Sequence, residues 1–147
     1  SADARCTPLT CHVADDSDAV TVRRTPPREL APKFGVGKLT HHVFLCDGPA
    51  CCDSELGKMA WGQLKRLAAQ VNLDEEQDAS LFVTRCSCLK FCDRGPIAVV
   101  YPDGTWYEQA DADVITRLIE EHVLGGKPVE EFRFATDDLC SRDRDRD

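Results

Sequence analysis

The feature that most constrains this chain is its supply of cysteine, with nine thiols among 147 residues. An odd number cannot close completely into disulfides within one chain. Six of the nine lie in two short stretches, 46–52 and 86–92, and buried cysteines acting as small apolar side chains do not explain such grouping. Where thiols stay reduced, grouped cysteines more often bind a metal or carry out redox chemistry. The sequence therefore predicts a metal or redox centre.

The spacing within these stretches narrows the chemistry. It reads Cys46-x4-Cys51, then 36 residues, then Cys88-x3-Cys92. Each pair follows a predicted strand, so a rigid scaffold can aim both loops at one point. Four thiolates fit either a [2Fe–2S] cluster or a tetrahedral zinc ion. Zinc knuckles commonly separate their cysteines by two residues, and neither pair does, so the spacing favours iron. No C-x-x-C occurs, which argues against a dithiol enzyme of the thioredoxin type.

Neighbouring cysteines leave the ligand set partly open. Cys52 adjoins Cys51, and Cys86 stands two residues before Cys88. Spacing favours Cys51 over Cys52. It favours Cys88 over Cys86 more strongly, because Cys86 would leave a five-residue gap before Cys92.

Three further cysteines lie near the two ends of the chain. Cys6-x4-Cys11 repeats the first spacing and is followed by His12, while Cys140 stands alone. A second metal site would need a fourth ligand, so free thiols in a loose extension explain these residues better.

Short apolar runs predict strands over 42–45, 81–84, 97–101 and 105–107. The last two flank Pro102-Asp103-Gly104, the strongest hairpin signal in the chain. The segment 129–134 is a candidate edge strand.

Apolar residues at three- and four-residue steps predict two amphipathic helices, over 56–71 and 114–123. Asp53 or Ser54 suits the cap of the first helix, and Gly125-Gly126 ends the second. The order β-α-β-β-β-α predicts an α/β fold, with a mixed sheet of four to five strands and two main helices.

The chain divides into three parts on the same pattern. Residues 1–40 are an N-terminal extension with little regular structure, in which 19–22 is one short strand candidate. Residues 41–134 form the cysteine-bearing domain. Residues 135–147 are a charged C-terminal tail, whose alternating Arg and Asp are typical of a solvated end.

Charge and hydropathy exclude several classes of partner. A net charge of −8 argues against nucleic-acid binding, which needs clustered Lys and Arg. No apolar run approaches the ~18 residues that would predict membrane insertion, and no secretory signal pattern is visible. We therefore expect a cytoplasmic protein whose acidic surface suits a partner with a basic docking face.

The run from Cys88 to Pro96, followed by Val99 to Tyr107, is similar to the second half of the thioredoxin-like [2Fe–2S] ferredoxins. Both cysteine pairs also resemble those of the small iron–sulfur subunit of bacterial complex I and of NAD-linked hydrogenases. The resemblance covers about residues 41–134. It implies a thioredoxin-like fold, one [2Fe–2S] cluster per chain and, as in the stand-alone ferredoxins, a homodimer. The loop 47–50 is shorter than in many stand-alone members.

The function predicted from these features is that of a ferredoxin, an electron carrier and not an enzyme, with Cys46, Cys51, Cys88 and Cys92 as ligands. The short first loop keeps open a cluster-bearing subunit of an NAD- or hydrogen-linked oxidoreductase. Two further alternatives are a zinc-stabilised interaction module and a thiol sensor using Cys51-Cys52 and Cys86-Cys88.

Residues next to the cysteines are expected to affect how the cluster is bound and reduced. Gly48 and Gly95 are expected to let backbone approach the cluster. The acids Asp47, Asp53 and Asp93 disfavour an added electron, while a helix that begins near Asp53 points its positive end at Cys51.

Two other residue types are expected to pack and not to react. His41 and His42 are expected to belong to a strand and not to a Rieske-type site, since four cysteines already match. Trp61 and Trp106 are expected to be packing residues.

Overall fold

The computed structural model of the chain describes residues 25–91 and 93–139. Sequence predictions that concern other positions lie outside these ranges: the 19–22 strand, Cys6, Cys11, His12, Cys92 and Cys140. Five strands form one sheet in the order β2-β1-β3-β4-β5. They are β1 (His41–Cys46), β2 (Leu81–Cys86), β3 (Ile97–Tyr101), β4 (Thr105–Tyr107) and β5 (Arg133–Thr136).

The sheet is mixed, as predicted. β1 runs parallel to β2 and antiparallel to β3, while β4 is antiparallel to both β3 and β5. The parallel pair is joined by a crossover through a long helix, as parallel strands require. Because β1 and β2 run the same way, Cys46 and Cys86 end at the same edge and are register partners. The first cysteine of each stretch is thereby fixed beside the other.

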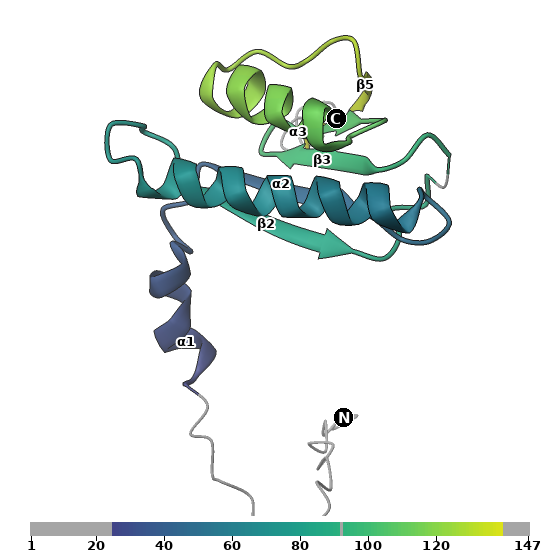
Figure 1. Ribbon diagram of the computed structural model, residues 1–147. Helices are drawn as coiled ribbons and strands as arrows, with labels where there is room; N and C mark the ends of the chain where they lie inside the picture. Colours follow the sequence, from purple (N-terminus) through teal and green to yellow (C-terminus); the bar gives the residue numbers. More distant parts are fainter. Residues whose placement is uncertain (1–24, 92, 140–147) are drawn as a thin grey trace, which may run out of the picture.

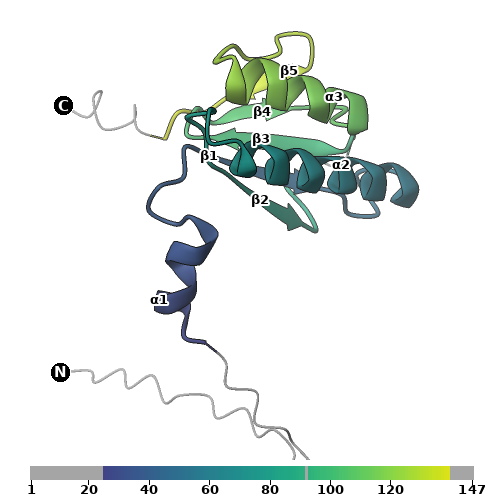
Figure 2. The same ribbon diagram turned by 60° about the vertical axis from the view of Figure 1, so that its left-hand side comes forward.

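Two helical segments lie side by side on one face of the sheet (Figures 1 and 2). α2 (Ser54–Leu73) is capped by Asp53, whose side chain accepts the N–H of Glu55 at 2.8 Å. α3 (Ala112–Arg117) is capped by Asp111 and continues into wider π-helical turns, η2 (Leu118–Leu124). Both helices predicted from periodicity are thus present. None of the described helices is long and apolar enough to cross a membrane.

The core lies between these helices and the sheet. Strand side chains alternate between the two faces, so Val43 and Leu45 of β1 and Ala98 and Val100 of β3 point toward the helices. They are buried against an apolar stripe from α2, α3 and η2 that includes Ala60, Leu64, Ala68, Val71, Val114, Ile115, Leu118, Ile119 and Val123.

The opposite face of the sheet carries no long helix in the described part of the chain (Figure 2). Its side chains come from alternate strand positions, and we call them the open face. Away from the cysteine edge, where Cys46, Cys86 and Ile97 share this face, they are His42, Phe44, Phe82, Thr84, Val99, Tyr101 and Trp106.

The predicted edge strand is displaced along the chain. Sequence placed it over 129–134, whereas β5 spans Arg133–Thr136. The buried Val129 amide instead donates to the Tyr107 hydroxyl at 3.2 Å. A register shift between Trp106 and Tyr107 lies where β5 meets β4. The first residue of the predicted strand, Val129, is therefore bonded to a side chain, and pairing with β4 begins only at Arg133.

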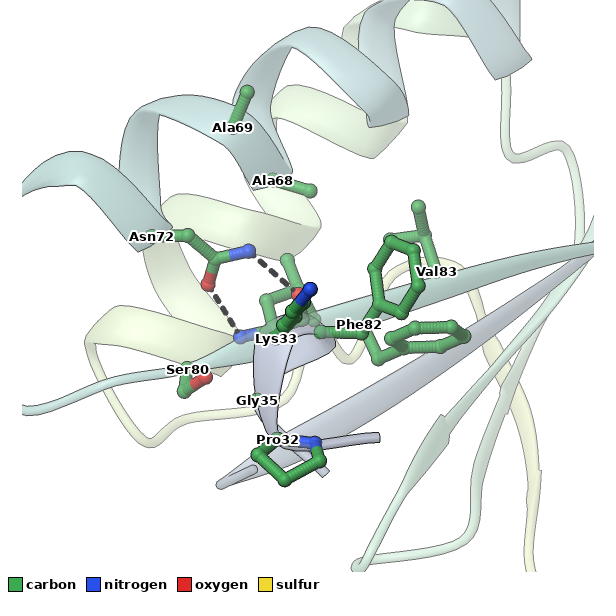
Figure 3. Close-up of a pocket in the computed structure, with 11 residues that line it drawn as sticks. Pro32, Lys33, Gly35, Ala68, Ala69, Asn72, Ser80, Phe82 and Val83 are labelled. Atoms are coloured by element: carbon green, nitrogen blue, oxygen red, sulfur yellow. Dashed lines mark hydrogen bonds between the residues drawn. The ribbon is translucent and has the colours of Figure 1, made fainter. Parts of the chain in front are cut away.

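The extension contains two short helical turns, α1 (Pro27–Leu30) and 3₁₀ helix η1 (Ala31–Phe34), neither with a buried residue. Between η1, α2 and the outer edge of β2 lies a cavity of about 510 Å³, shown in Figure 3. The Asn72 side chain binds both the N–H and the C=O of Leu81 there, each at 2.8 Å. Asn72 thus replaces a neighbouring strand at that point of the edge.

Candidate metal centre

The first predicted ligand pair meets at the end of β1. Cys46 is its last residue, and Cys51 follows after a four-residue loop. Their Sγ atoms lie 3.0 Å apart, and both residues are buried, at 0% and 7% exposure. The Cys51 N–H donates to the Gly48 carbonyl at 2.9 Å, which turns the chain back toward the strand. The structure therefore brings together the pair that spacing favoured.

The two cysteine loops are locked to one another through Cys51. Its Sγ lies 3.5 Å from the Phe91 carbonyl oxygen, in the loop between Cys88 and Cys92. Its own carbonyl accepts the Gly95 N–H at 3.0 Å. Residues 40 and 44 positions further along the chain, Phe91 and Gly95, thus both contact this cysteine.

Two glycines permit this contact. A Cβ on Gly48 would lie 1.9 Å from the Ser87 carbonyl oxygen, and one on Gly95 would lie 2.2 Å from that of Cys51. No side chain fits at such distances, so both positions require glycine. The close approach that the structure describes is to the backbone of the other cysteine loop, and the approach to a cluster stays a prediction.

The second pair is only partly described. Cys88 is exposed, and its Sγ accepts the Lys90 N–H at 3.3 Å, with Lys90 at a φ of 74°. Such amide donors to sulfur are typical of cysteine loops that hold iron–sulfur clusters. In residues 25–91 and 93–139 no three side chains of His, Cys, Asp or Glu converge as a metal site. The fourth predicted ligand, Cys92, lies outside these ranges.

The alternative cysteines lie close by in different surroundings. Cys52 is half-buried against the first turn of α2, and desolvation, then Asp47 and Cys46, raise the pKa of its thiol. Desolvation and the adjacent Cys46 raise the pKa of Cys86 to about 11. A reactive sensor thiol needs a lowered pKa. The surroundings of Cys52 and Cys86 therefore disfavour the thiol-sensor alternative.

An ion pair between a buried carboxylate and an exposed arginine stands next to Cys46 and was not anticipated. The Asp47 side chain is only 5% exposed, and its Oδ2 lies 2.6 Å from Nε of Arg85. The Asp47 carboxylate raises the pKa of Arg85. Sequence reasoning counted Asp47 as an uncompensated charge. The register places Arg85 opposite Leu45, one position before the cysteine edge, so only the strand pairing identifies the cation.

The histidines and tryptophans behave as packing residues. His42 stacks on Phe44 with ring centroids 4.1 Å apart, and its Nε2 lies 2.7 Å from Thr84 Oγ1. Trp61 packs against the core, and Trp106 contacts Phe91 at a centroid distance of 5.4 Å.

Comparison with known proteins follows the same line. No family model matches the chain. A protein of Priestia megaterium named as a 2Fe-2S ferredoxin is 37% identical over 91 residues, 62% of this chain and 67% of that protein. A 2Fe-2S ferredoxin of Aquifex aeolicus is 36% identical over 93 residues, 60% of this chain and 84% of that protein.

A solved structure agrees with these relatives. The thioredoxin-like [2Fe–2S] ferredoxin of Aquifex aeolicus matches with a TM-score of 0.57 and 27% sequence identity, covering 67% of this chain and 93% of that one. Fold, sequence and cysteine geometry point the same way. The chain therefore belongs to the thioredoxin-like [2Fe–2S] ferredoxin family.

Proposed function

We propose that Cys46, Cys51, Cys88 and Cys92 hold one [2Fe–2S] cluster, and that the chain carries single electrons between protein partners. The observation that carries this proposal is the 3.0 Å approach of the buried Cys46 and Cys51 sulfurs, in a loop locked to the Cys88–Cys92 segment. A set of cysteine sulfurs at a shielded edge suits iron better than a hard cation. When bound, the cluster supplies one-electron exchange.

The surrounding residues set the conditions of that exchange. The Lys90 amide lies within hydrogen-bond distance of the Cys88 sulfur, where it offsets negative charge on the ligand. Arg85 compensates the buried Asp47 carboxylate beside Cys46. The first turn of α2 begins three residues after Cys51 and adds its positive end. These groups favour acceptance of an electron in a chain whose net charge of −8 opposes it.

Iron and sulfide content together with the visible spectrum test this function. A purified protein with two irons and two sulfides per chain, red-brown and bleached by dithionite, is expected. A colourless protein that contains one zinc would instead establish the interaction module.

The homodimer implied by the family is proposed to form through the open face. Its aromatic side chains are half-buried, and burial lowers the pKa of His42, which favours the uncharged imidazole. No other open-face residue is ionisable below pH 9. A second copy, itself at −8, meets less charge repulsion at such an uncharged surface. Two sheets stack face to face with about 10 Å between them.

Light scattering tests this interface. Thr84→Arg places a charge on the open face and is expected to convert a dimer into a monomer. Ala69→Arg, on the exposed side of α2, adds the same charge elsewhere and leaves the dimer intact. A Thr84→Arg protein that remains dimeric would place the interface on another surface.

A further inference from the structure

A groove opens where α2 and α3 begin. It is lined by Leu56 and Met59 of α2 and by Asp111, Ala112 and Asp113, with a volume of about 170 Å³. Met59 is 62% exposed. An unbranched methionine side chain adapts to differently shaped partners and is common on binding surfaces. This groove thus offers an apolar floor to the solvent.

The rim of the groove is acidic. Asp111 and Asp113 line it opposite Leu56 and Met59. The nearby cation, Lys58, is 3.2 Å from Glu55 and is offset by it. The exposed Asp113 is the carboxylate least committed to the fold, since Asp111 caps α3.

The groove is close to the cysteine loops on both sides. The Ala110 N–H donates to the Pro96 carbonyl at 2.8 Å, and the Gln109 N–H to that of Arg94 at 2.7 Å. The chain just before Asp111 is thus bonded to the segment that follows Cys92. On the other side, Met59 stands six residues after the cap Asp53, about 9 Å along the helix axis.

A second groove of similar composition lies at the far end of the helices. Its volume is about 150 Å³, and its lining includes Leu67, Asp74, Glu120 and Leu124. From Met59 to Asp74 the helix axis rises about 22 Å. The two grooves therefore differ in distance from the cysteines far more than in chemistry, and each is the natural control for the other.

We propose that the groove at Met59 and Asp113 is the docking site of the redox partner, a protein that presents an apolar side chain surrounded by Lys and Arg. The proposal rests on the electron-carrier function above. Charge complementarity steers the basic face of the partner to the acidic rim, and the apolar floor receives the central side chain. Backbone hydrogen bonds join the chain before Asp111 to the segment that follows Cys92.

Electron transfer to ferric cytochrome c, a small basic haem protein, tests the site. One electron passes from the dithionite-reduced protein to the haem iron, with no bond made or broken, and stopped-flow absorbance gives the second-order rate constant. Asp113→Lys and Glu120→Lys change the net charge equally, one at each groove. Met59→Gln and Leu124→Gln form the corresponding apolar pair.

We expect Asp113→Lys to slow transfer about three- to tenfold at low ionic strength and to flatten its dependence on salt. Met59→Gln is expected to slow it at every salt concentration. Glu120→Lys and Leu124→Gln should stay within about twofold of the unmodified chain. Equal slowing by Asp113→Lys and Glu120→Lys, or no slowing by either, would overturn the proposal.

The visible spectrum separates this result from a failure of the proposed function. A wild-type protein without the cluster absorption would refute electron carriage itself. If Asp113→Lys loses absorption while the wild type keeps it, Asp113→Asn, which keeps the side-chain shape, takes its place with the same expected order.

Discussion

Buried polar atoms have different kinds of partner at the two ends of the sheet. At the turn between β3 and β4, the Val129 N–H donates to the Tyr107 hydroxyl, which lies 2.7 Å from His122 Nδ1, while His122 Nε2 lies 2.5 Å from Asp103 Oδ2. Nε2–H donates to Asp103, because a carboxylate oxygen only accepts. Every polar atom of this chain of contacts has a partner from the protein.

At the other end, Cys46 and Cys51 are also buried, but their sulfurs face each other, and the Cys51 sulfur also faces the Phe91 carbonyl. Thiols are weak hydrogen-bond donors and acceptors, so these contacts contribute little stability. The comparison teaches that the turn end is held by the protein's own side chains, whereas the cysteine end is arranged for a cofactor. Substitutions at the two ends should therefore have separable effects.

The largest effect is expected at the ligands. Cys46→Ser, Cys51→Ser and Cys88→Ser are each expected to abolish the visible absorption, because the remaining three thiolates cannot saturate two irons. Absorbance and iron content of the purified variants provide the measurement. Cys52→Ala is the matched control and should keep the colour. A red-brown Cys51→Ala protein beside a colourless Cys52→Ala protein would shift the ligand by one residue.

Next in size is the effect of closing the gap between the cysteine loops. Gly95→Ala puts a Cβ about where the Cys51 carbonyl stands, at 2.2 Å, so the loop must move and cluster content should fall by more than half. Gly62→Ala is the control, since nothing lies within 4 Å of its Cβ and it sits on an exposed part of α2. That change should stabilise the fold by about 0.5–1 kcal/mol. Full iron occupancy in Gly95→Ala would contradict the packing argument.

At the turn end, Tyr107→Phe removes one hydroxyl and leaves two buried groups, the Val129 N–H and His122 Nδ1, without that partner. We expect a loss of about 1–3 kcal/mol in the free energy of unfolding, measured by urea titration. The visible spectrum should not change, because the lost hydroxyl bonds Val129 and His122 and not a cysteine. A bleached Tyr107→Phe protein would show that the two ends are coupled.

The smallest effect concerns alkaline pH. Burial raises the pKa of Tyr107 to about 12, while an exposed tyrosine titrates near 10. Between these values the unfolded chain loses the phenol proton first, so the free energy of unfolding falls as pH rises from about 10 to 12 and is unaffected below 10. The slope of stability against pH in this window should be steeper in the wild type than in Tyr107→Phe. Identical slopes would contradict the assignment.

The parts of the fold that the sequence predicted are those encoded by residues close together in the chain. The bounds predicted for β3 and β4 are those observed, since a turn and its flanking strands are encoded within a dozen residues. Asp53, one of the two caps proposed, caps α2, because a cap depends on its own neighbours along the chain. The choice of Cys51 over Cys52 rested on loop length, and the structure places Cys51 beside Cys46.

By itself, then, the sequence determined the order of the strands and of the two main helices, the mixed sheet and the family. Tertiary structure alone decided that Arg85 neutralises Asp47, that His122 links Asp103 to Tyr107, that β5 starts at Arg133, and that Gly48 and Gly95 serve contact between two loops. The physical reason is the separation along the chain between the residues that interact. Helix periodicity, caps and tight turns arise from neighbours in the chain, whereas these pairings depend on strand register and on packing between segments that the sequence leaves far apart.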